Sequence, residues 1–235
     1  MEELIRIENI TKKFGSKTVL KDVNISVKKR EIYGIVGNNG AGKTTLLKIV
    51  CGMLKQTSGK IEFINKDKKN NLIGTLIESP GLFKDMTGFE NLKAKALLLG
   101  ARSSDEDING LLKLVGLENT EKKSVRAYSM GMKQRLGIAL ALVGEPDLLI
   151  LDEPINGLDP QGINEVHKII MEIHRTRGVT MMISSHILDE LAKTATRFCV
   201  IKDGTVIKEC PTEQFLSECG DRDINEYYVE LINKA

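Results

Sequence analysis

Two kinds of apolar pattern recur along the chain, and they predict two kinds of β-strand. The first alternates apolar with polar side chains, which is typical of half-exposed antiparallel strands. It covers residues 4–9, 23–27 and 60–64. The second is continuously apolar, as in parallel strands that helices cover on both faces. It covers residues 32–37, 148–152 and 180–184.

Helical patterns follow several of these runs. They cover residues 43–52, 133–143, 161–177 and 187–195. A strand followed by a helix, several times over, predicts a layered α/β core built on a mixed, largely parallel sheet. The alternating runs add antiparallel strands toward the N-terminus.

The pattern changes between about residues 84 and 145, where strand signals stop and helical segments dominate. We therefore expect an α-helical subdomain at about 84–145, inserted into a core made of 1–83 and 146–210. The short extension 211–235 follows, and the whole of 1–235 is predicted to be one domain.

The C-terminal part has its own local signals. A hairpin is expected over residues 198–209, because Asp203-Gly204 is a favoured two-residue turn. A short capped helix is expected from Thr212. The last segment, 224–235, is compatible with either a strand or a helix.

Composition excludes several classes of protein. The net charge is +2, from 34 basic and 32 acidic residues, so the basic surplus of a nucleic-acid-binding protein is absent and no nucleic-acid partner is expected. No apolar run approaches the roughly 18–20 residues of a membrane helix. The cysteines lack a CxxC spacing and are expected to be reduced thiols of the cytosol; they are Cys51, Cys199, Cys210 and Cys219.

The strongest chemical signal is GNNGAGKTT, which lies after a buried strand and opens a helix. This G-x-x-x-x-G-K-[ST] pattern predicts a phosphate-binding loop, in which backbone N–H groups and a helix N-terminus face the phosphates. Lys43 is expected to neutralise the β- and γ-phosphates of ATP, and the Thr44 hydroxyl to bind Mg²⁺. The loop consists of Gly37, Asn38, Asn39, Gly40, Ala41, Gly42, Lys43, Thr44 and Thr45.

A second signal is LLILDEP at 148–154, where a buried strand ends in two adjacent acids. Successive strand residues point to opposite faces, so the two acids should have different functions. Asp152 is expected to hold Mg²⁺ through water, and Glu153 to act as the general base toward the attacking water. The structural alternative is that both acids cap the next helix. Together with the phosphate-binding loop, this segment predicts a P-loop NTPase.

The segment YSMGMKQR at 128–135 narrows the class further. It resembles the signature sequence of ATP-binding cassette (ABC) ATPases, whose usual form is LSGGQ. Ser129 and Gly131 match that form, whereas Tyr128, Met130 and Met132 depart from it. The resemblance implies an ABC ATPase with a RecA-like core.

Three further segments carry the same resemblance. NGLDP at 156–160 resembles the D-loop of the family, with Asp159 in it. His186 in ISSH resembles the switch histidine that senses the γ-phosphate, although a lone histidine after a buried strand is more often structural. KKFGSKTVL resembles the adenine-stacking segment, which implies that Phe14 and Val19 contact the base.

The working state is implied by this resemblance. Two copies of the chain would dimerise head to tail, so that the Ser129–Met132 segment of one acts on ATP held by the P-loop of the other. Closing and reopening of this dimer would move polytopic permease subunits, which the helical insertion would contact. The chain would lie peripherally on the cytoplasmic face of the membrane.

Glu78, in IGTLIESPGLF, lies where the family usually carries the glutamine of the Q-loop. The acid keeps an oxygen for Mg²⁺, adds a negative charge and removes the amide donor. We expect Glu78 to be a metal ligand and to contribute to catalysis; the alternative is a solvated acid that turns outward.

The glutamate, together with the YSMGMKQR segment, also resembles one subfamily: the ATPases of bacitracin and lantibiotic self-protection exporters. We therefore expect an ATPase that powers export of such peptides. An importer ATPase and a soluble ABC ATPase acting on ribosomes or DNA are the alternatives, and the single cassette and near-neutral charge disfavour the latter.

Overall fold

The computed structural model describes residues 2–64, 73–120 and 122–234, and the chain divides into two compact units. The first joins Met1–Lys69 to Thr180–Ala235, and the second spans Asn70–Val179. Each unit has its own apolar core. Ile5, Val36 and Phe198 are fully buried in the first, and Leu92 and Leu149 in the second.

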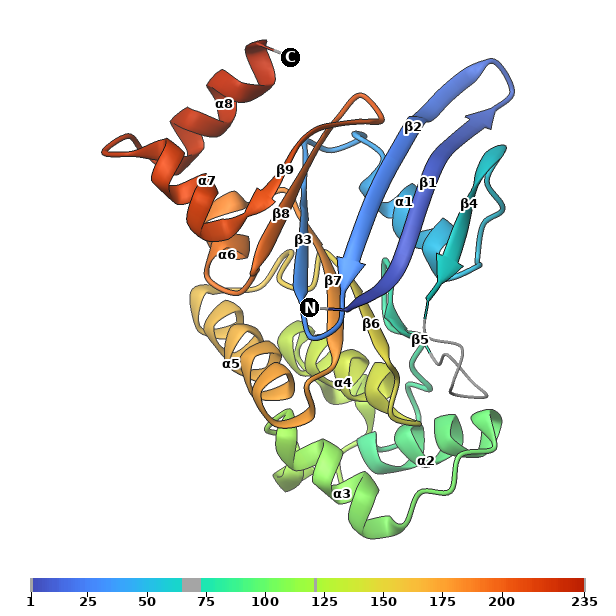
Figure 1. Ribbon diagram of the computed structural model, residues 1–235. Coiled ribbons are helices and arrows are strands. Elements are labelled where there is room, and N and C mark those ends of the chain that lie inside the picture. The colour runs from blue at the N-terminus through green and yellow to red at the C-terminus, as the bar shows by residue number, and fades with distance from the viewer. Residues whose placement is uncertain (1, 65–72, 121, 235) are drawn as a thin grey trace. The chain divides into compact units, whose positions relative to one another are not determined.

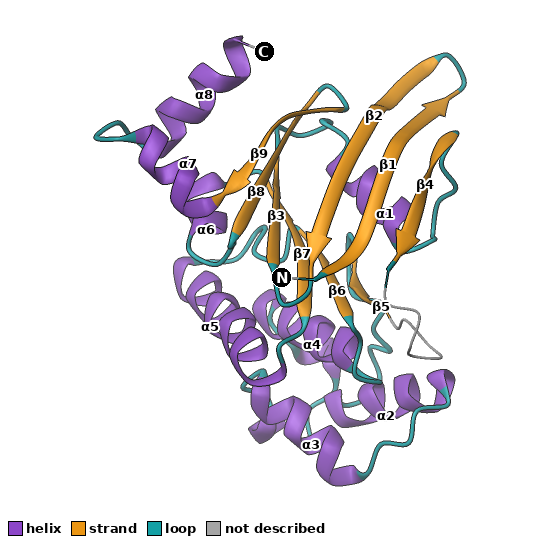
Figure 2. Ribbon diagram, viewed as in Figure 1, coloured by secondary structure: helices purple, strands orange, loops and turns teal. Residues whose placement is uncertain are grey.

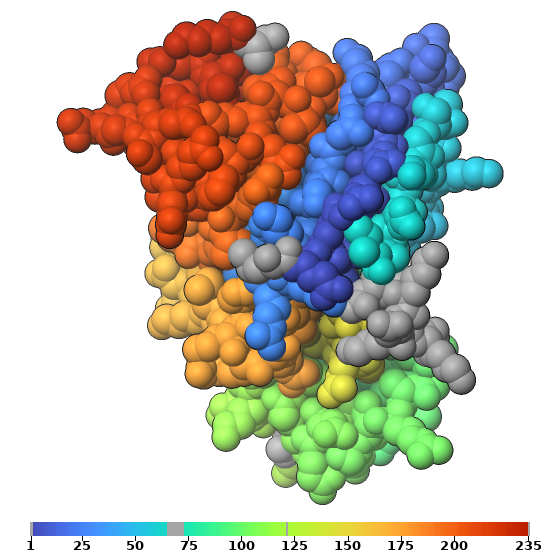
Figure 3. Space-filling view, in the orientation of Figure 1, coloured from blue at the N-terminus to red at the C-terminus, as the bar shows by residue number. Residues whose placement is uncertain are grey.

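The first unit contains an antiparallel sheet in the order β2-β1-β4. Its strands are β1 (Glu3–Phe14), β2 (Lys17–Lys28) and β4 (Ser58–Phe63). Ile7 of β1 pairs with Ile25 of β2 and Ile61 of β4. The predicted antiparallel strands are therefore confirmed, although β1 and β2 extend further than the alternating pattern indicates. Their side chains form one continuous blue-to-cyan band in Figure 3.

A second group of strands in this unit has the order β7-β3-β8-β9. These are β3 (Ile32–Val36), β7 (Thr180–Ser185), β8 (Arg197–Lys202) and β9 (Thr205–Pro211). β3 is parallel to both β7 and β8, as the continuously apolar runs predict, and β9 returns antiparallel to β8 (Figure 1). Lys202 pairs with Thr205, so Asp203-Gly204 forms the predicted two-residue turn.

The helices of the first unit are α1 (Lys43–Val50), α6 (Leu188–Ala192), α7 (Thr212–Cys219) and α8 (Ile224–Lys234). The last segment, whose sequence is compatible with either a strand or a helix, thus forms the helix α8. The short helix predicted from Thr212 is confirmed as α7, but no described side chain caps its start. Thr212 is already the first helical residue, and its hydroxyl donates to the Ala195 carbonyl at 2.6 Å.

Aromatic rings hold α7 and α8 to the strands. The Phe215 ring of α7 lies 5.3 Å from that of Phe198 on β8 and 5.1 Å from that of Tyr227 on α8, measured between ring centroids. The Arg222 guanidinium lies 4.8 Å from the Tyr227 ring centroid. Tilted aromatic pairs of this kind stabilise packing beyond the area they bury.

The second unit contains the parallel pair β5 (Ile73–Leu76) and β6 (Leu148–Asp152). The backbone of α4 packs closely on β5: a Cβ added to Gly74 would lie only 1.9 Å from the Ala141 carbonyl oxygen. Glycine at 74 therefore permits this approach, which fixes α4 against the strand that leads to Glu78.

Helices make up most of the second unit (Figure 2). They are α2 (Gly88–Leu99), α3 (Asp105–Leu114), α4 (Met130–Leu142) and α5 (Pro160–Arg177), with short 3₁₀ segments at Glu118–Thr120 and Val125–Ala127. Thr87-Glu90 and Ser104-Asp107 form capping boxes that start α2 and α3, each satisfying N–H groups that the helix itself leaves open.

The predicted helical stretch 84–145 thus contains α2, α3 and α4. Among the described residues, no helix is both long enough and apolar enough to cross a lipid bilayer.

Candidate functional site

The loop between β3 and α1 has the backbone of a phosphate cradle. Gly42 has φ +108° and precedes Lys43, the first residue of α1. A Cβ at Gly42 would lie 2.7 Å from the Leu20 side chain, so a larger residue is excluded sterically as well as conformationally. No described side chain caps the start of α1, which leaves its N-terminus suited to an anion. Asn38, Asn39 and Gly40 are exposed.

Lys43 folds back over this loop. Its side chain is buried, and its Nζ donates to the Gly37 carbonyl at 2.7 Å and to the Asn38 carbonyl at 3.4 Å. These bonds hold the ammonium group inside the curve of the loop, where it can meet phosphate oxygens. Thr44 and Thr45 follow in the first turn of α1 and are partly exposed.

His186 lies beside the phosphate-binding loop within the first unit. Val36, the last residue of β3, pairs in parallel with Ser185, the last residue of β7. The next residues along the two strands are Gly37 and His186. Because neighbouring strands lie about 4.8 Å apart, the sheet delivers His186 next to the first residue of the loop.

The predicted base-contacting segment belongs to the same unit. Phe14 ends β1 with half of its surface exposed, and the Lys12 ammonium lies 4.7 Å from its ring centroid. The Val19 carbonyl approaches the loop, since a Cβ added to Gly42 would lie 3.1 Å from the Val19 oxygen.

The turn between β8 and β9 also belongs to this site, although no sequence pattern predicted it there. In the structure, the Gly204 N–H donates to the Ala41 carbonyl at 3.0 Å, and the Gly204 carbonyl accepts from the Lys21 N–H at 2.8 Å. The Asp203-Gly204 signal identified a hairpin, but its partner in the phosphate-binding loop is more than 160 positions earlier in the chain, which no local pattern reveals.

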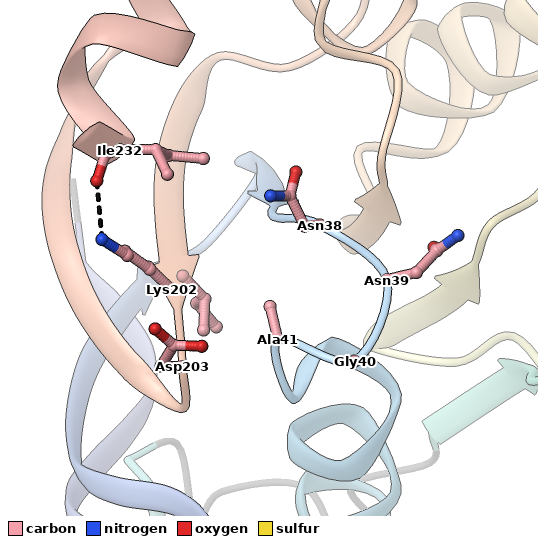
Figure 4. A pocket seen from close by; sticks show the side chains of 8 residues that line it. Asn38, Asn39, Gly40, Ala41, Lys202, Asp203 and Ile232 are labelled. Carbon is pink, nitrogen blue, oxygen red and sulfur yellow. Dashed lines mark hydrogen bonds between the residues drawn. The ribbon is translucent and has the colours of Figure 1, made fainter.

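A pocket of about 150 Å³ lies between this turn and the loop (Figure 4). Its walls include Asn38, Asn39 and Ala41 on one side, and Lys202 and Ile232 on the other. The Lys202 Nζ donates to the Ile232 carbonyl at 2.7 Å, which joins α8 to the turn.

The two acids of LLILDEP are placed at the carboxyl end of β6. Asp152 is its last residue and is buried, whereas Glu153 is partly exposed and has φ +50°. The strand alternation used to separate their functions therefore does not extend to Glu153. The left-handed backbone at Glu153, rather than the pleat of the strand, sets the direction of its side chain.

Glu78 lies two residues beyond the end of β5 at Leu76, is exposed and has φ +63°. Leu76 pairs with Leu151 in the parallel β5–β6 register. Two positions further along each strand direction are Glu78 and Glu153, so two acids, both with left-handed backbone, follow adjacent strand ends. The exposure of Glu78 is consistent with the alternative of a solvated acid. The left-handed backbone of Glu78 and its position beside Glu153 favour a functional role, because strained backbone is concentrated at functional sites.

The predicted signature residues open α4. The Ser129 hydroxyl oxygen caps this helix by accepting from the Met132 N–H at 3.2 Å, and Gly131 and Met132 lie in the first turn. Tyr128, which departs from the usual leucine, is buried, and its hydroxyl lies 2.7 Å from that of Thr120. The tyrosine that replaces the usual leucine thus packs inside the second unit, whereas Met130 is 59% exposed.

The predicted D-loop lies beside the signature segment. Asp159 caps α5 by accepting from the Gly162 N–H at 2.9 Å. Gly157 has φ +74°, and a Cβ there would lie 2.8 Å from the terminal methyl of Met130. The two segments therefore approach each other closely within the second unit.

Helix α4 also connects the signature segment to the region of Glu78. A Cβ added to Gly137 on α4 would lie 2.8 Å from Pro80 and 2.9 Å from Leu76. The helix that begins after Ser129 therefore packs directly on the two ends of the segment that holds Glu78.

The structure thus groups the predicted site residues in two sets. The first unit holds the phosphate-binding loop, His186 and the Val19 segment. The second holds the three acids together with the signature and D-loop segments. Thr44 in the first unit and Asp152 in the second supply a hydroxyl and a carboxylate, and each is an oxygen donor of the kind that Mg²⁺ prefers.

The comparisons with known proteins agree with these features. The family model described as ABC transporter matches residues 20–156. The chain is 44% identical over 209 residues to the lantibiotic transport ATP-binding protein SrtF of Streptococcus pyogenes, covering 88% of this chain and 90% of that protein. It is 41% identical over 241 residues to the bacitracin transport ATP-binding protein BcrA of Bacillus licheniformis, covering 100% of this chain and 78% of that protein.

A solved structure shows the same fold. The ATP-binding cassette MJ0796, in a dimeric post-hydrolysis state bound to ADP and Pi, matches with a TM-score of 0.77 and 26% identity. The match covers 89% of this chain and 99% of that chain. The predicted α/β cassette fold is therefore confirmed.

Proposed function

This chain belongs to the ABC transporter family, and on that premise we propose that it powers the export of lantibiotic- or bacitracin-type peptides and so protects the cell from them. It is an ATP-binding subunit that hydrolyses ATP, coupled to transport. The cargo is inferred from the two relatives named for lantibiotic and bacitracin transport, to which the chain is similar over most of its length.

The observation that best supports ATP binding at this site is the pairing of β3 with β7. Because Val36 pairs with Ser185, the segment 37–45 and His186 follow adjacent strand ends. We assign Lys43 and the N–H groups of residues 38–44 to the phosphates, and His186 to the terminal phosphate. Phe14 and Val19 would contact the base.

Hydrolysis is assigned to the acids that follow β5 and β6. Glu153 would take a proton from the attacking water as general base, because its carboxylate follows the buried strand end that carries Asp152. Asp152, Thr44 and Glu78 would hold Mg²⁺. When bound, this ion offsets charge on the phosphates.

We further propose that two copies of the chain assemble around ATP and associate peripherally with permease subunits on the cytoplasmic face of the membrane. The dimeric state of a similar solved cassette supports this. So does the exposure of Ser129 and Met130, which leaves the signature surface open for a partner copy. Ser129, Met130, Gly131 and Met132 would then act on ATP held by the other copy.

Peptide resistance tests the cargo assignment. We expect a susceptible bacterium that expresses this chain with its permease to tolerate higher concentrations of bacitracin or a lantibiotic, because export lowers the amount of peptide at the membrane. The measurement is the minimal inhibitory concentration, with the Glu153→Gln chain and the same permease as control. Equal values for the two strains with every peptide, while the purified wild-type chain hydrolyses ATP, would reject the cargo and leave the ATPase assignment intact.

Glu78→Gln tests whether this acid is a metal ligand. We expect the Mg²⁺ concentration that gives half-maximal ATPase activity to rise by about tenfold, because a neutral amide binds the ion more weakly than a carboxylate does. ATPase rate and peptide transport are measured together over a Mg²⁺ titration.

Glu145→Gln is the matched control, since Glu145 is also an exposed glutamate with positive φ (+57°) and lies in the turn before β6. An unchanged Mg²⁺ dependence with unchanged transport in Glu78→Gln would support the solvated-acid alternative.

A further inference from the structure

The turn between β8 and β9 uses both polar groups of one residue to bridge two parts of the nucleotide site. The Gly204 N–H donates to Ala41 in the phosphate-binding loop at 3.0 Å, and the Gly204 carbonyl accepts from Lys21 on β2 at 2.8 Å. Lys21 lies two residues after Val19, the residue that ends the segment assigned to the base. Gly204 therefore ties the phosphate side of the site to its base side.

The space around Gly204 admits only glycine. The residue is buried and has φ +80°, which residues with a side chain rarely adopt. A Cβ there would lie 2.2 Å from the Val19 carbonyl oxygen and 2.8 Å from the Val19 carbonyl carbon. Both contacts are to backbone, so a rotamer change cannot relieve them, and either the base segment or the turn would have to move.

The turn is held on its other side as well. Lys202, the last residue of β8, donates through Nζ to the Ile232 carbonyl of α8 at 2.7 Å (Figure 4). Asp203 has φ +47°, as a two-residue hairpin turn requires. Fixed by α8 and by the β8–β9 ladder, the turn cannot easily follow a displacement of Val19.

We propose that Gly204 is a positioning residue for nucleotide binding, which sets the spacing between the phosphate-binding loop and the Phe14–Val19 segment without touching ATP. The proposal rests on the proposed assignment of both segments to one nucleotide. A ligand that occupies two subsites at once gains affinity only when their spacing matches its length. A ligand that occupies the phosphate side alone does not depend on that spacing.

Gly204→Ala tests this with two ligands, Mg²⁺-ATP and Mg²⁺-tripolyphosphate, titrated calorimetrically into the purified chain. We expect the Kd for ATP to rise by about tenfold, and the Kd for tripolyphosphate to stay within about threefold of the wild-type value, because only ATP spans both subsites. An unchanged Kd for ATP, or an equal rise for both ligands, would overturn the positioning role.

Gly52→Ala is the control for backbone strain, because Gly52 has φ +75° and no described atom within 4 Å of an added Cβ; both Kd values should match the wild type. If circular dichroism shows that Gly204→Ala does not fold, Asp203→Ala replaces it. This milder change to the turn should raise the Kd for ATP by about fivefold and leave the Kd for tripolyphosphate unchanged. An unchanged Kd for ATP, or equal losses for both ligands, would again refute the proposal. Failure of the wild-type chain to bind ATP would instead refute the nucleotide-site assignment.

Discussion

Glu153→Gln is expected to lower the ATP hydrolysis rate by about 10²- to 10⁴-fold, the contribution typical of a positioned general base. The amide keeps the size of the side chain and an acceptor oxygen, but it cannot take the proton of the attacking water. ATP binding should persist, so the variant should accumulate as an ATP-bound dimer. The measurements are the steady-state ATPase rate and the molecular mass in solution with ATP.

Glu145→Gln is again the matched control, because it makes the same change at another exposed glutamate with left-handed backbone; its rate should equal that of the wild type. A normal rate in Glu153→Gln would show that Glu153 is not the base. Glu78 would then be the next candidate, since it follows the adjacent strand at the corresponding position.

Lys43→Met is expected to weaken ATP binding by at least about 30-fold, which corresponds to the lower end of the roughly 2–5 kcal/mol lost when one partner of a buried charge pair is removed. The ammonium group is held inside the loop by the carbonyls of Gly37 and Asn38. Lys43 is the only basic residue among residues 37–45, so no other side chain of the loop can supply its charge. Methionine retains most of the apolar volume at this buried position. The measurement is the Kd for Mg²⁺-ATP by calorimetry.

Lys48→Met, in the last turn of the same helix, controls for the loss of a positive charge and should leave the Kd unchanged. The thermal unfolding temperature without ATP separates a folding defect from a binding defect. If Lys43→Met binds ATP within about threefold of the wild type while Lys48→Met weakens binding, the assigned function of Lys43 is wrong.

Elements with a local cause were predictable from the sequence. The apolar runs identified β3, β6 and β7 because burial on both faces leaves no polar position in a strand. The Asp203-Gly204 turn was found because few residue pairs adopt positive φ twice in succession. The phosphate-binding loop was also found locally, since its glycines and lysine are contiguous.

Features that depend on distant contacts were not predictable. The helix that starts at Thr212 was expected to be capped, but no described side chain caps α7, and the Thr212 hydroxyl donates to the carbonyl of Ala195, which lies in the segment before β8. The left-handed backbone at Glu78 and Glu153 was also missed, because glutamate has no local preference for it. Gly204 carried a turn signal, while its bond to Ala41 depends on the tertiary fold.

The close fit between Met130 and Gly157 constrains how cassettes of this type can be recombined. The methionine methyl lies 2.8 Å from where a Cβ at position 157 would stand, but Met130 is exposed and flexible and can move aside. The backbone of Gly157 cannot adjust in the same way, because its φ of +74° is rarely adopted by residues with a side chain. A chimaera that joins the YSMGMKQR segment of this chain to another cassette should therefore keep a glycine at the position of Gly157, whatever its cargo.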